Sequence, residues 1–264
     1  MNKRERQMLD LLKQGRDQYG YVGVKAEFEA EGTRTDELLR LIELARKADL
    51  NVGLKIGGCE AVRDLIESKQ FGVEYVIAPM IETPYALQKF IDAKNRTYTE
   101  EEKESTQFLF NLETETGFTH KEKLFEVACS EGGTDGVVFG RVDYSLSKNV
   151  GRDQINSDQI TQDASDIARM AVNHQELVVG GGVSIDALPA LREIHRIHLT
   201  RFETRKIIFS ATSLETEGVN TGLLQAVHFE LLWLQNKRDH YRFIELEDEK
   251  RISMLEERWR VLGQ

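Results

Sequence analysis

Several short segments of the sequence alternate apolar residues with charged, polar or glycine residues. Side chains alternate between the two faces of an extended strand, so each segment would have one charged face and one apolar face. The charged positions that stand out are Lys25, Glu27 and Glu29 in YVGVKAEFE, Lys55 in NVGLKIGG, Glu113 in QFLFNLET, and Arg141 and Asp143 in DGVVFGRVD. Carboxylates and cations gathered in this way could bind a metal ion and an anionic substrate.

Glu113 and Asp143 fall on neighbouring segments of this kind and offer hard oxygen ligands. Mg²⁺ and Mn²⁺ prefer a few carboxylates and leave their other coordination positions to water or substrate. Beside a 2-oxo acid, such a cation would polarise the carbonyl group and stabilise the enolate, while Lys55 or Arg141 could hold the substrate carboxylate. Carboxylates at strand ends also form structural ion pairs, and the alternation alone does not name the ligands.

The elements that would position these residues alternate between strand and helix along the chain. Seven apolar segments, among them DGVVFGRVD, ELVVGGGVS and RKIIFSA, are separated by helical patterns such as TDELLRLIELARKA. This alternation is typical of parallel βαβ units, and it predicts an α/β fold, a (β/α)8 barrel of the TIM type. We expect the eighth strand N-terminal of Val22, where the sequence looks helical, and hence an irregular first strand. An open doubly wound sheet is the alternative.

In a closed barrel the charged face of each strand would line the lumen. Parallel sheets are normally covered on both faces, so a sheet with one face in water does not fit the alternation of strands and helices. The charged positions gather at the C-terminal ends of the strands, where the active sites of (β/α)8 barrels lie. We therefore expect the active site at this end of the barrel.

Length and composition fit one domain over residues 1–264. A single (β/α)8 barrel needs about 250 residues. The formal net charge of −10 argues against binding to nucleic acid or to an anionic membrane, because both depend on clustered lysine and arginine. The first 20 residues lack the unbroken apolar stretch of a secretion signal, and the 2 cysteines are too few for a disulfide framework. A cytoplasmic protein is expected.

Three segments, VIAPMIET, FNLETETG and GTDGVVFGRVDYSLSKNVG, resemble the HpcH/HpaI aldolase and citrate lyase family of the pyruvate and phosphoenolpyruvate barrels. The resemblance covers roughly residues 22–185. It implies that Glu113 in FNLET and Asp143 in GRVDYS bind a divalent metal, Mg²⁺, Mn²⁺ or a similar ion. It also implies a substrate such as pyruvate, oxaloacetate, a related 2-oxo acid or an acyl-CoA, and reversible cleavage of a carbon–carbon bond.

The chain departs from this family at two places. Lys55 in GLKIGGCEA stands where the family has an arginine, and lysine lacks the planar fork that grips a carboxylate through two parallel bonds. The histidine that the aldolases carry after an acidic strand end is missing from AEFEAEG. Glu27 or Glu29 could act as the base instead, because burial can raise the pKa of a carboxylate. Either could equally be engaged in an ion pair with a neighbouring lysine.

Gly180, Gly181 and Gly182 in LVVGGGVS precede a predicted helix at a late strand end. Barrels often bind phosphate at such a place through backbone N–H groups and a helix N-terminus. The segment FSATS on the last strand could complete the cup, which would admit a phosphorylated substrate. The glycines could instead permit a tight turn.

The stretch from about Thr221 to Trp259 has a helical pattern and is longer than one barrel helix requires. A last barrel helix with a solvated tail is one interpretation. We favour the other, in which residues 221–264 form an arm that packs on a neighbouring subunit of a homo-oligomer.

Three functions are compatible with these features. The leading hypothesis is a metal-dependent lyase or aldolase that acts on a small 2-oxo acid through an enolate. A phosphoenolpyruvate-dependent enzyme that condenses two substrates into a sugar acid would account for the glycine cup and the missing histidine. A barrel without activity that serves as an assembly subunit would account for the long helix.

Overall fold

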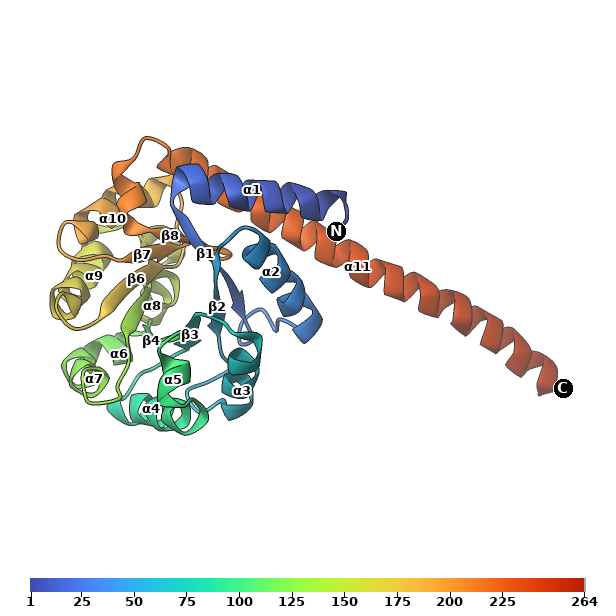
Figure 1. The fold of residues 1–264 in the computed structure, drawn as a ribbon, viewed down its shortest axis with the longest axis horizontal. Coiled ribbons are helices and arrows are strands. Elements are labelled where there is room, and N and C mark those ends of the chain that lie inside the picture. Colours follow the sequence, from blue (N-terminus) through green and yellow to red (C-terminus); the bar gives the residue numbers. More distant parts are fainter. Residues whose placement is uncertain (264) are drawn as a thin grey trace.

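Eight strands close into a barrel in the computed structural model, which describes residues 1–263 (Figure 1). The strands follow one another around the barrel in sequence order. Their bounds are β1 Tyr21–Glu27, β2 Asn51–Lys55, β3 Tyr75–Ala78, β4 Gln107–Leu112, β5 Gly136–Gly140, β6 Glu176–Gly180, β7 Arg201–Glu203 and β8 Ile207–Ser210. The predicted barrel is confirmed, and the open sheet is excluded.

Helices surround the barrel and make most of the connections between strands. Their bounds are α1 Lys3–Tyr19, α2 Thr35–Lys47, α3 Val62–Phe71, α4 Pro84–Thr97, α5 Glu100–Lys103, α6 Glu115–Thr119, α7 Lys121–Ala128, α8 Arg141–Ser147, α9 Asp158–Ala171, α10 Leu188–His195 and α11 Val219–Leu262. The apolar face of each strand packs under these helices, and Val24, Val52 and Phe110 are fully buried there. The opposite face of each strand is left for the lumen.

The last two strands depart from the regular pattern. β8 runs antiparallel to both of its neighbours, β7 and β1. Residues 204–206 alone connect β7 to β8, so no helix lies between them. Ser210 pairs with Arg201, which places the C-terminal end of β8 beside the N-terminal end of β7. The connecting hairpin therefore lies at the end of the barrel where the parallel strands finish.

The eighth strand is not where the sequence predicted it. The residues before Tyr21 form α1, which begins after the capping residue Asn2 and ends at Tyr19, with Gly20 as its C-cap. The strand that the sequence missed is β7, whose three residues are too few to give an apolar segment. β1 pairs regularly with β2, and its register shifts only against β8, between Tyr21 and Gly23.

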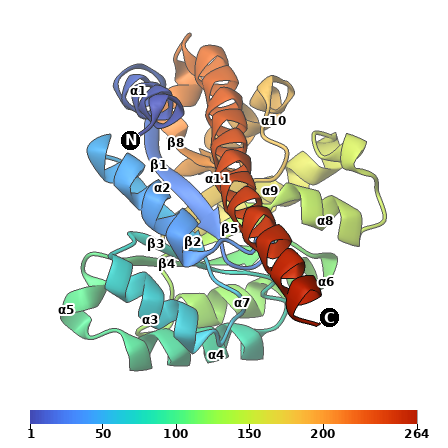
Figure 2. The same cartoon turned by 90° about the vertical axis from the view of Figure 1, so that its right-hand side faces the viewer.

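α11 is one continuous helix of 44 residues. Its first part lies beside α1, and the remainder projects away from the barrel (Figure 1). Seen along the projecting direction, the helix crosses in front of the barrel (Figure 2). The predicted C-terminal helix is confirmed. Within residues 1–263, no helix has the length and apolar character needed to cross a membrane.

Candidate active site

A cavity of about 610 Å³ opens at the C-terminal ends of the parallel strands. Apolar side chains of the lumen form a floor beneath it: Tyr75, Ile77, Leu109, Val138, Val178 and Ile208. The charged side chains that line it are Lys25, Lys55, Arg152, Arg205, Glu27, Glu29, Glu113, Asp143, Glu203 and Glu230. The expected charged mouth is therefore present, with six carboxylates against four cations.

Glu113 is the most deeply buried carboxylate that lines this cavity, at 2% exposed. Its Oε1 accepts a hydrogen bond from the backbone N–H of Met80 at 3.1 Å and lies 3.3 Å from Nζ of Lys55. Its Oε2 accepts a hydrogen bond from Nδ2 of Asn111 at 2.6 Å. Gly140 leaves the necessary space, because a Cβ there would lie 2.6 Å from Oε2 of Glu113. The carboxylate is therefore fixed before any ligand arrives.

The chain turns into a helix directly after Glu113, and this turn fixes the end of β4. Thr114 caps α6 by accepting a hydrogen bond from the backbone N–H of Gly117 at 3.0 Å. A threonine in this position satisfies a backbone donor that the first turn of a helix leaves without a partner. The motif NLET thus places the carboxylate on the strand end and the cap immediately behind it.

Arg141 and Asp143 lie in the first turn of α8, and their predicted place on a strand is wrong because β5 ends at Gly140. Asp143 is exposed and lines the cavity. Arg141 is buried and does not belong to the lining. Its guanidinium donates hydrogen bonds at 2.8 to 3.3 Å to the carbonyl oxygens of Gly180 and Gly181 and to Oδ1 of Asn156. Arg141 therefore supports the glycine loop instead of facing the cavity.

Lys55 lies between two carboxylates, with Nζ 3.3 Å from Oε2 of Glu29 and 3.3 Å from Oε1 of Glu113. Burial disfavours the ammonium form, but the attraction of Glu113 and Glu29 is stronger in sum, and the pKa of Lys55 is raised. Lys55 is therefore a cation at neutral pH. It supplies a positive charge next to Glu113 at the mouth of the barrel.

Lys25 makes a second group of ion pairs, with Glu203 and, at 3.2 Å, with Oε1 of Glu27. Burial disfavours the ionised form of Glu27, but Lys25 and Lys55 outweigh it and lower the pKa of this carboxyl group. Glu27 is thus held as a carboxylate by its neighbours. The side chain of Glu29 is 29% exposed, against 10% for Glu27, and is the more accessible of the two.

Gly180, the last residue of β6, and the two glycines after it line the cavity, and the backbone makes a tight turn there. Gly181 and Gly182 have φ angles of 79° and 62°, in the left-handed region that favours glycine. A Cβ at Gly181 would lie 2.6 Å from the backbone nitrogen of Val142. The turn and the close approach of α8 both require glycine here.

The predicted completion of a phosphate cup by FSATS is wrong. This segment begins in β8, which runs antiparallel to the other strands. Ser210 lies opposite Arg201 at the start of β7, at the far end of the barrel from the cavity. The glycines of the mouth therefore lack the second half of the cup that the sequence indicated.

The sequence of this chain matches no family model and no curated protein. Solved structures do match. Citrate synthase SbnG superposes with a TM-score of 0.58 at 18% identity, over 75% of this chain and 81% of that one. An HpcH/HpaI aldolase from Desulfitobacterium hafniense DCB-2 gives 0.59 at 12% identity, over 74% and 82%. An HpcH/HpaI aldolase/citrate lyase family protein from Burkholderia cenocepacia J2315 gives 0.59 at 13% identity, over 85% and 90%.

The chain has the HpcH/HpaI aldolase fold. The resemblance that the motifs indicated is thereby confirmed at the level of the fold. In this chain the ends of β4 and β5 lie at one mouth of the barrel, where Glu113 and Asp143 line the cavity.

Asn111 lines this mouth, and the sequence did not single it out. Its Oδ1 is buried and accepts no hydrogen bond, while its Nδ2 donates to Glu113. The signal was present, because Asn111 precedes Glu113 by two positions and so shares its face of the strand. Met80 was also missed: its φ of 51° is unusual for a residue with a side chain, and it directs a backbone N–H at Glu113.

The oxygen atoms at this mouth suit a hard divalent cation. Oε2 of Glu113 accepts one hydrogen bond and keeps a lone pair, Oδ1 of Asn111 accepts none, and Asp143 is exposed. Carboxylate and amide oxygens are the ligands that Mg²⁺ and related ions prefer. No group of three acidic, histidine or cysteine side chains that could hold a metal occurs in residues 1–263. A cation would therefore depend on two carboxylates, an amide oxygen and the substrate.

Proposed function

We propose that this protein is a lyase of the aldolase kind that acts on a small 2-oxo acid, such as pyruvate or oxaloacetate, through a metal-stabilised enolate. The observation that carries this proposal is the fixed carboxylate of Glu113 beside the open amide oxygen of Asn111, with Asp143 at the same mouth. These residues would hold Mg²⁺ or Mn²⁺. When bound, the cation would polarise the substrate carbonyl group and favour loss of a proton from the adjacent carbon.

The charge of the cavity supports a cation. Six carboxylates and four cationic side chains line it, which leaves an excess of two negative charges. A 2-oxo acid is an anion and would be repelled by this excess. One divalent cation would neutralise it, and the substrate would then find a site without net repulsion.

Lys55 is suited to hold the substrate carboxylate. Its raised pKa keeps it protonated, and it lies beside Glu113, where the cation would be held. A lysine that forms an imine with a carbonyl substrate must first lose its proton. The carboxylates around Lys55 and Lys25 oppose that loss, which favours enolate chemistry over imine chemistry at this mouth.

Glu29 is the best candidate for the group that moves the proton. Among residues 1–263, no histidine lines the cavity. The base would therefore be another type of residue. Glu27 has a lowered pKa and two lysines nearby, and both properties weaken it as a base. Within residues 1–263, the one ion pair of Glu29 is with Lys55, and Glu29 lines the cavity.

Exchange of the methyl protons of pyruvate with deuterium from the solvent tests the proposed function directly. We expect exchange that depends on added Mg²⁺ or Mn²⁺ and that falls by at least about 100-fold in Glu113→Ala and in Asp143→Ala, since both lose a metal ligand. Glu230→Ala removes another carboxylate of the same cavity and is the matched control. Unchanged exchange in Glu113→Ala would show that the proposed site is wrong.

Two further measurements separate the alternatives. Release of phosphate from phosphoenolpyruvate in the presence of an aldehyde, without exchange on pyruvate, would favour the condensing enzyme. Absence of metal binding in the purified protein would favour an inactive assembly subunit. The lyase proposal is the better supported, because the cup predicted for a phosphate is incomplete.

A further inference from the structure

One face of α11 stays uncovered along most of the helix. Apolar residues recur on it at alternating intervals of three and four positions: Leu224, Val227, Leu231, Leu234, Ile252, Leu255, Trp259 and Leu262. All eight are exposed, from 47% for Leu255 to 80% for Trp259. We call these eight residues the seam. Their spacing is the heptad repeat by which helices pair in coiled coils, and an apolar stripe of this length is rarely left in water.

The middle of the same repeat is polar. Between the proximal half of the seam, which ends at Leu234, and its distal half, the repeat passes through Arg238, Tyr241, Glu245 and Asp248. Tyr241 is engaged within its own chain, where its hydroxyl donates to Glu37 at 2.6 Å. The seam therefore consists of two apolar halves that flank a charged centre.

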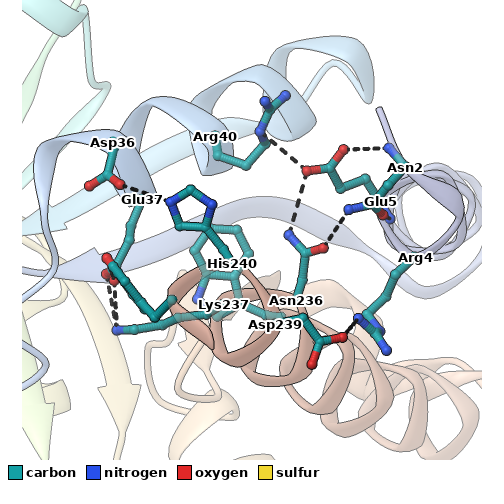
Figure 3. A pocket seen from close by; sticks show the side chains of 12 residues that line it. Asn2, Arg4, Glu5, Asp36, Glu37, Arg40, Asn236, Lys237, Asp239 and His240 are labelled. Carbon is teal, nitrogen blue, oxygen red and sulfur yellow. Dashed lines mark hydrogen bonds and ion pairs between the residues drawn. The ribbon is translucent and has the colours of Figure 1, made fainter. Parts of the chain in front are cut away.

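A group of polar contacts fixes the direction in which α11 leaves the barrel (Figure 3). Glu37 of α2 accepts a hydrogen bond from Nζ of Lys237 at 3.0 Å, and Arg4 of α1 pairs with Asp239 at 2.7 Å. Beyond Tyr241, every residue up to position 263 is exposed. The distal half of the seam thus finds no cover within residues 1–263 of its own chain.

We propose that the seam is covered by α11 of a second copy of this chain, which runs antiparallel to the first. The proximal half of one seam lies against the distal half of the other when the two-fold axis passes near residue 243 of both helices. Four pairs of seam residues then face each other across the two chains. They are Leu224 with Leu262 of the partner subunit, Val227 with Trp259 of the partner subunit, Leu231 with Leu255 of the partner subunit, and Leu234 with Ile252 of the partner subunit. Each seam residue meets an apolar residue, and the two-fold axis repeats every contact.

The charged centre selects this orientation. In the antiparallel pair Arg238 lies opposite Asp248 of the partner subunit. In a parallel pair Arg238 would meet its own copy, and so would Glu245 and Asp248, which places like charges together. Only the antiparallel pair places Arg238 opposite an acidic residue, and it sets Glu245 opposite Tyr241 of the partner subunit instead of opposite its own copy.

The charged centre also selects the register. A shift of one heptad in one direction would place Arg238 opposite Leu255 of the partner subunit. A shift in the other direction would place Leu231 opposite Asp248 of the partner subunit. Both shifts therefore leave some seam residues without an apolar partner.

This pairing would extend the wall of the barrel mouth. Val227 of the seam and Glu230 line the cavity described above. With Trp259 of the partner subunit opposite Val227, the second copy would bring an indole ring to the rim of each cavity. The dimer itself does not depend on the proposed function, whereas this contribution to the active site does.

Disulfide cross-linking tests the pairing and its orientation. Cys59 and Cys129 are first replaced by serine, and Leu234→Cys and Ile252→Cys are introduced separately and together. The two positions lie about 27 Å apart within one helix, so they can be joined only between chains. We expect cross-linked dimers from the double variant and none from either single variant. Cross-linking of both single variants would show a parallel pair and overturn the proposal.

The mass in solution tests the role of the seam on the full-length chain. Wild type should have twice the mass of the 30.2 kDa chain, and Leu255→Lys should shift the protein to a monomer. Met254→Lys is the matched control, because Met254 is 51% exposed beside Leu255 but lies off the seam. A wild-type monomer, a dimer that survives Leu255→Lys, or loss of the dimer in Met254→Lys would each overturn the proposal. Metal-dependent pyruvate exchange in the Leu255→Lys monomer would show that the proposed function stands apart from the dimer.

Discussion

Two glutamates near the end of β1 differ sharply in their surroundings. Glu27 is 7% exposed and pairs with Lys25, which also pairs with Glu203. Glu29, two positions later, contacts Lys55 and is more exposed. Burial among cations stabilises a carboxylate but makes it a weak base, whereas partial exposure leaves a carboxylate free to exchange a proton. We therefore assign Glu27 to the stability of the mouth and Glu29 to proton transfer.

Glutamine substitutions at these two positions should have opposite consequences. Glu29→Gln should lower kcat for pyruvate exchange by about 100-fold or more, the usual loss when a general base is removed, with little change in stability. Glu27→Gln should lower the free energy of unfolding by about 1–3 kcal/mol, since Lys25 loses a buried partner, and should leave kcat within about tenfold. Urea unfolding and exchange kinetics on both variants provide the check, and a larger kcat loss in Glu27→Gln would reverse the assignment.

The stability that Glu27 contributes should depend on pH in a defined direction. Its pKa in the folded chain is lower than the ordinary value of 4.5, so at acidic pH the folded state binds fewer protons than the unfolded state. The contribution is fully present above pH 4.5 and is lost as the pH falls through the lower folded-state pKa. The stability difference between wild type and Glu27→Gln should accordingly shrink below that pH.

Strand alternation predicted the mouth well for the residues that really lie at strand ends. Lys25, Lys55 and Glu113 all face the cavity, as their parity required. The same rule was wrong for Arg141, because β5 ends at Gly140 and the next residues form a helix. In a helix, successive side chains turn by a different angle, so Asp143 reaches the cavity while Arg141 is buried. A two-residue period does not reveal where a strand stops.

At the scale of elements, the antiparallel hairpin of β7 and β8 determines which residues line one side of the cavity. It brings the connection 204–206 to the cavity, where Arg205 lies 3.1 Å from Oε1 of Glu31. The sequence did not predict the hairpin, since β7 is very short and strand direction leaves no local signal. The closed barrel was predictable because it depends on repeated alternation, whereas this connection depends on how the last strand fills the remaining gap.

The glycine turn after β6 should tolerate no side chain at position 181. Gly181→Ala would force a Cβ into the left-handed region and to within 2.6 Å of the backbone of α8. We expect a loss of about 1–3 kcal/mol in the free energy of unfolding, measured by urea denaturation. Gly58→Ala is the control, because a Cβ there would have no neighbour within 4 Å, and it should change stability by less than about 0.5 kcal/mol. Equal stability of the two variants would contradict this account of the turn.

At the scale of the whole molecule, the barrel and its long C-terminal helix α11 have different roles. The barrel holds the charged cavity, and α11 lines part of it through Val227 and Glu230. Beyond these residues the helix projects away from the barrel (Figure 1). The sequence predicted the helix and an assembly role for it. It could not show that the distal half lies clear of the barrel, because that follows from the contacts of Lys237, Asp239 and Tyr241 with α1 and α2. Those contacts join residues about 200 positions apart in the chain.

Binding of Mn²⁺, followed by electron paramagnetic resonance of the free ion, tests the central claim most directly. Wild type should bind one Mn²⁺ per chain at the mouth, and Glu113→Gln and Asp143→Asn should each raise the Kd by at least about tenfold, since each loses a charged ligand. Glu230→Gln, which keeps both proposed ligands, should bind as wild type does. Mn²⁺ binding of equal affinity in wild type, Glu113→Gln and Asp143→Asn would contradict the metal site and the enolate chemistry built on it.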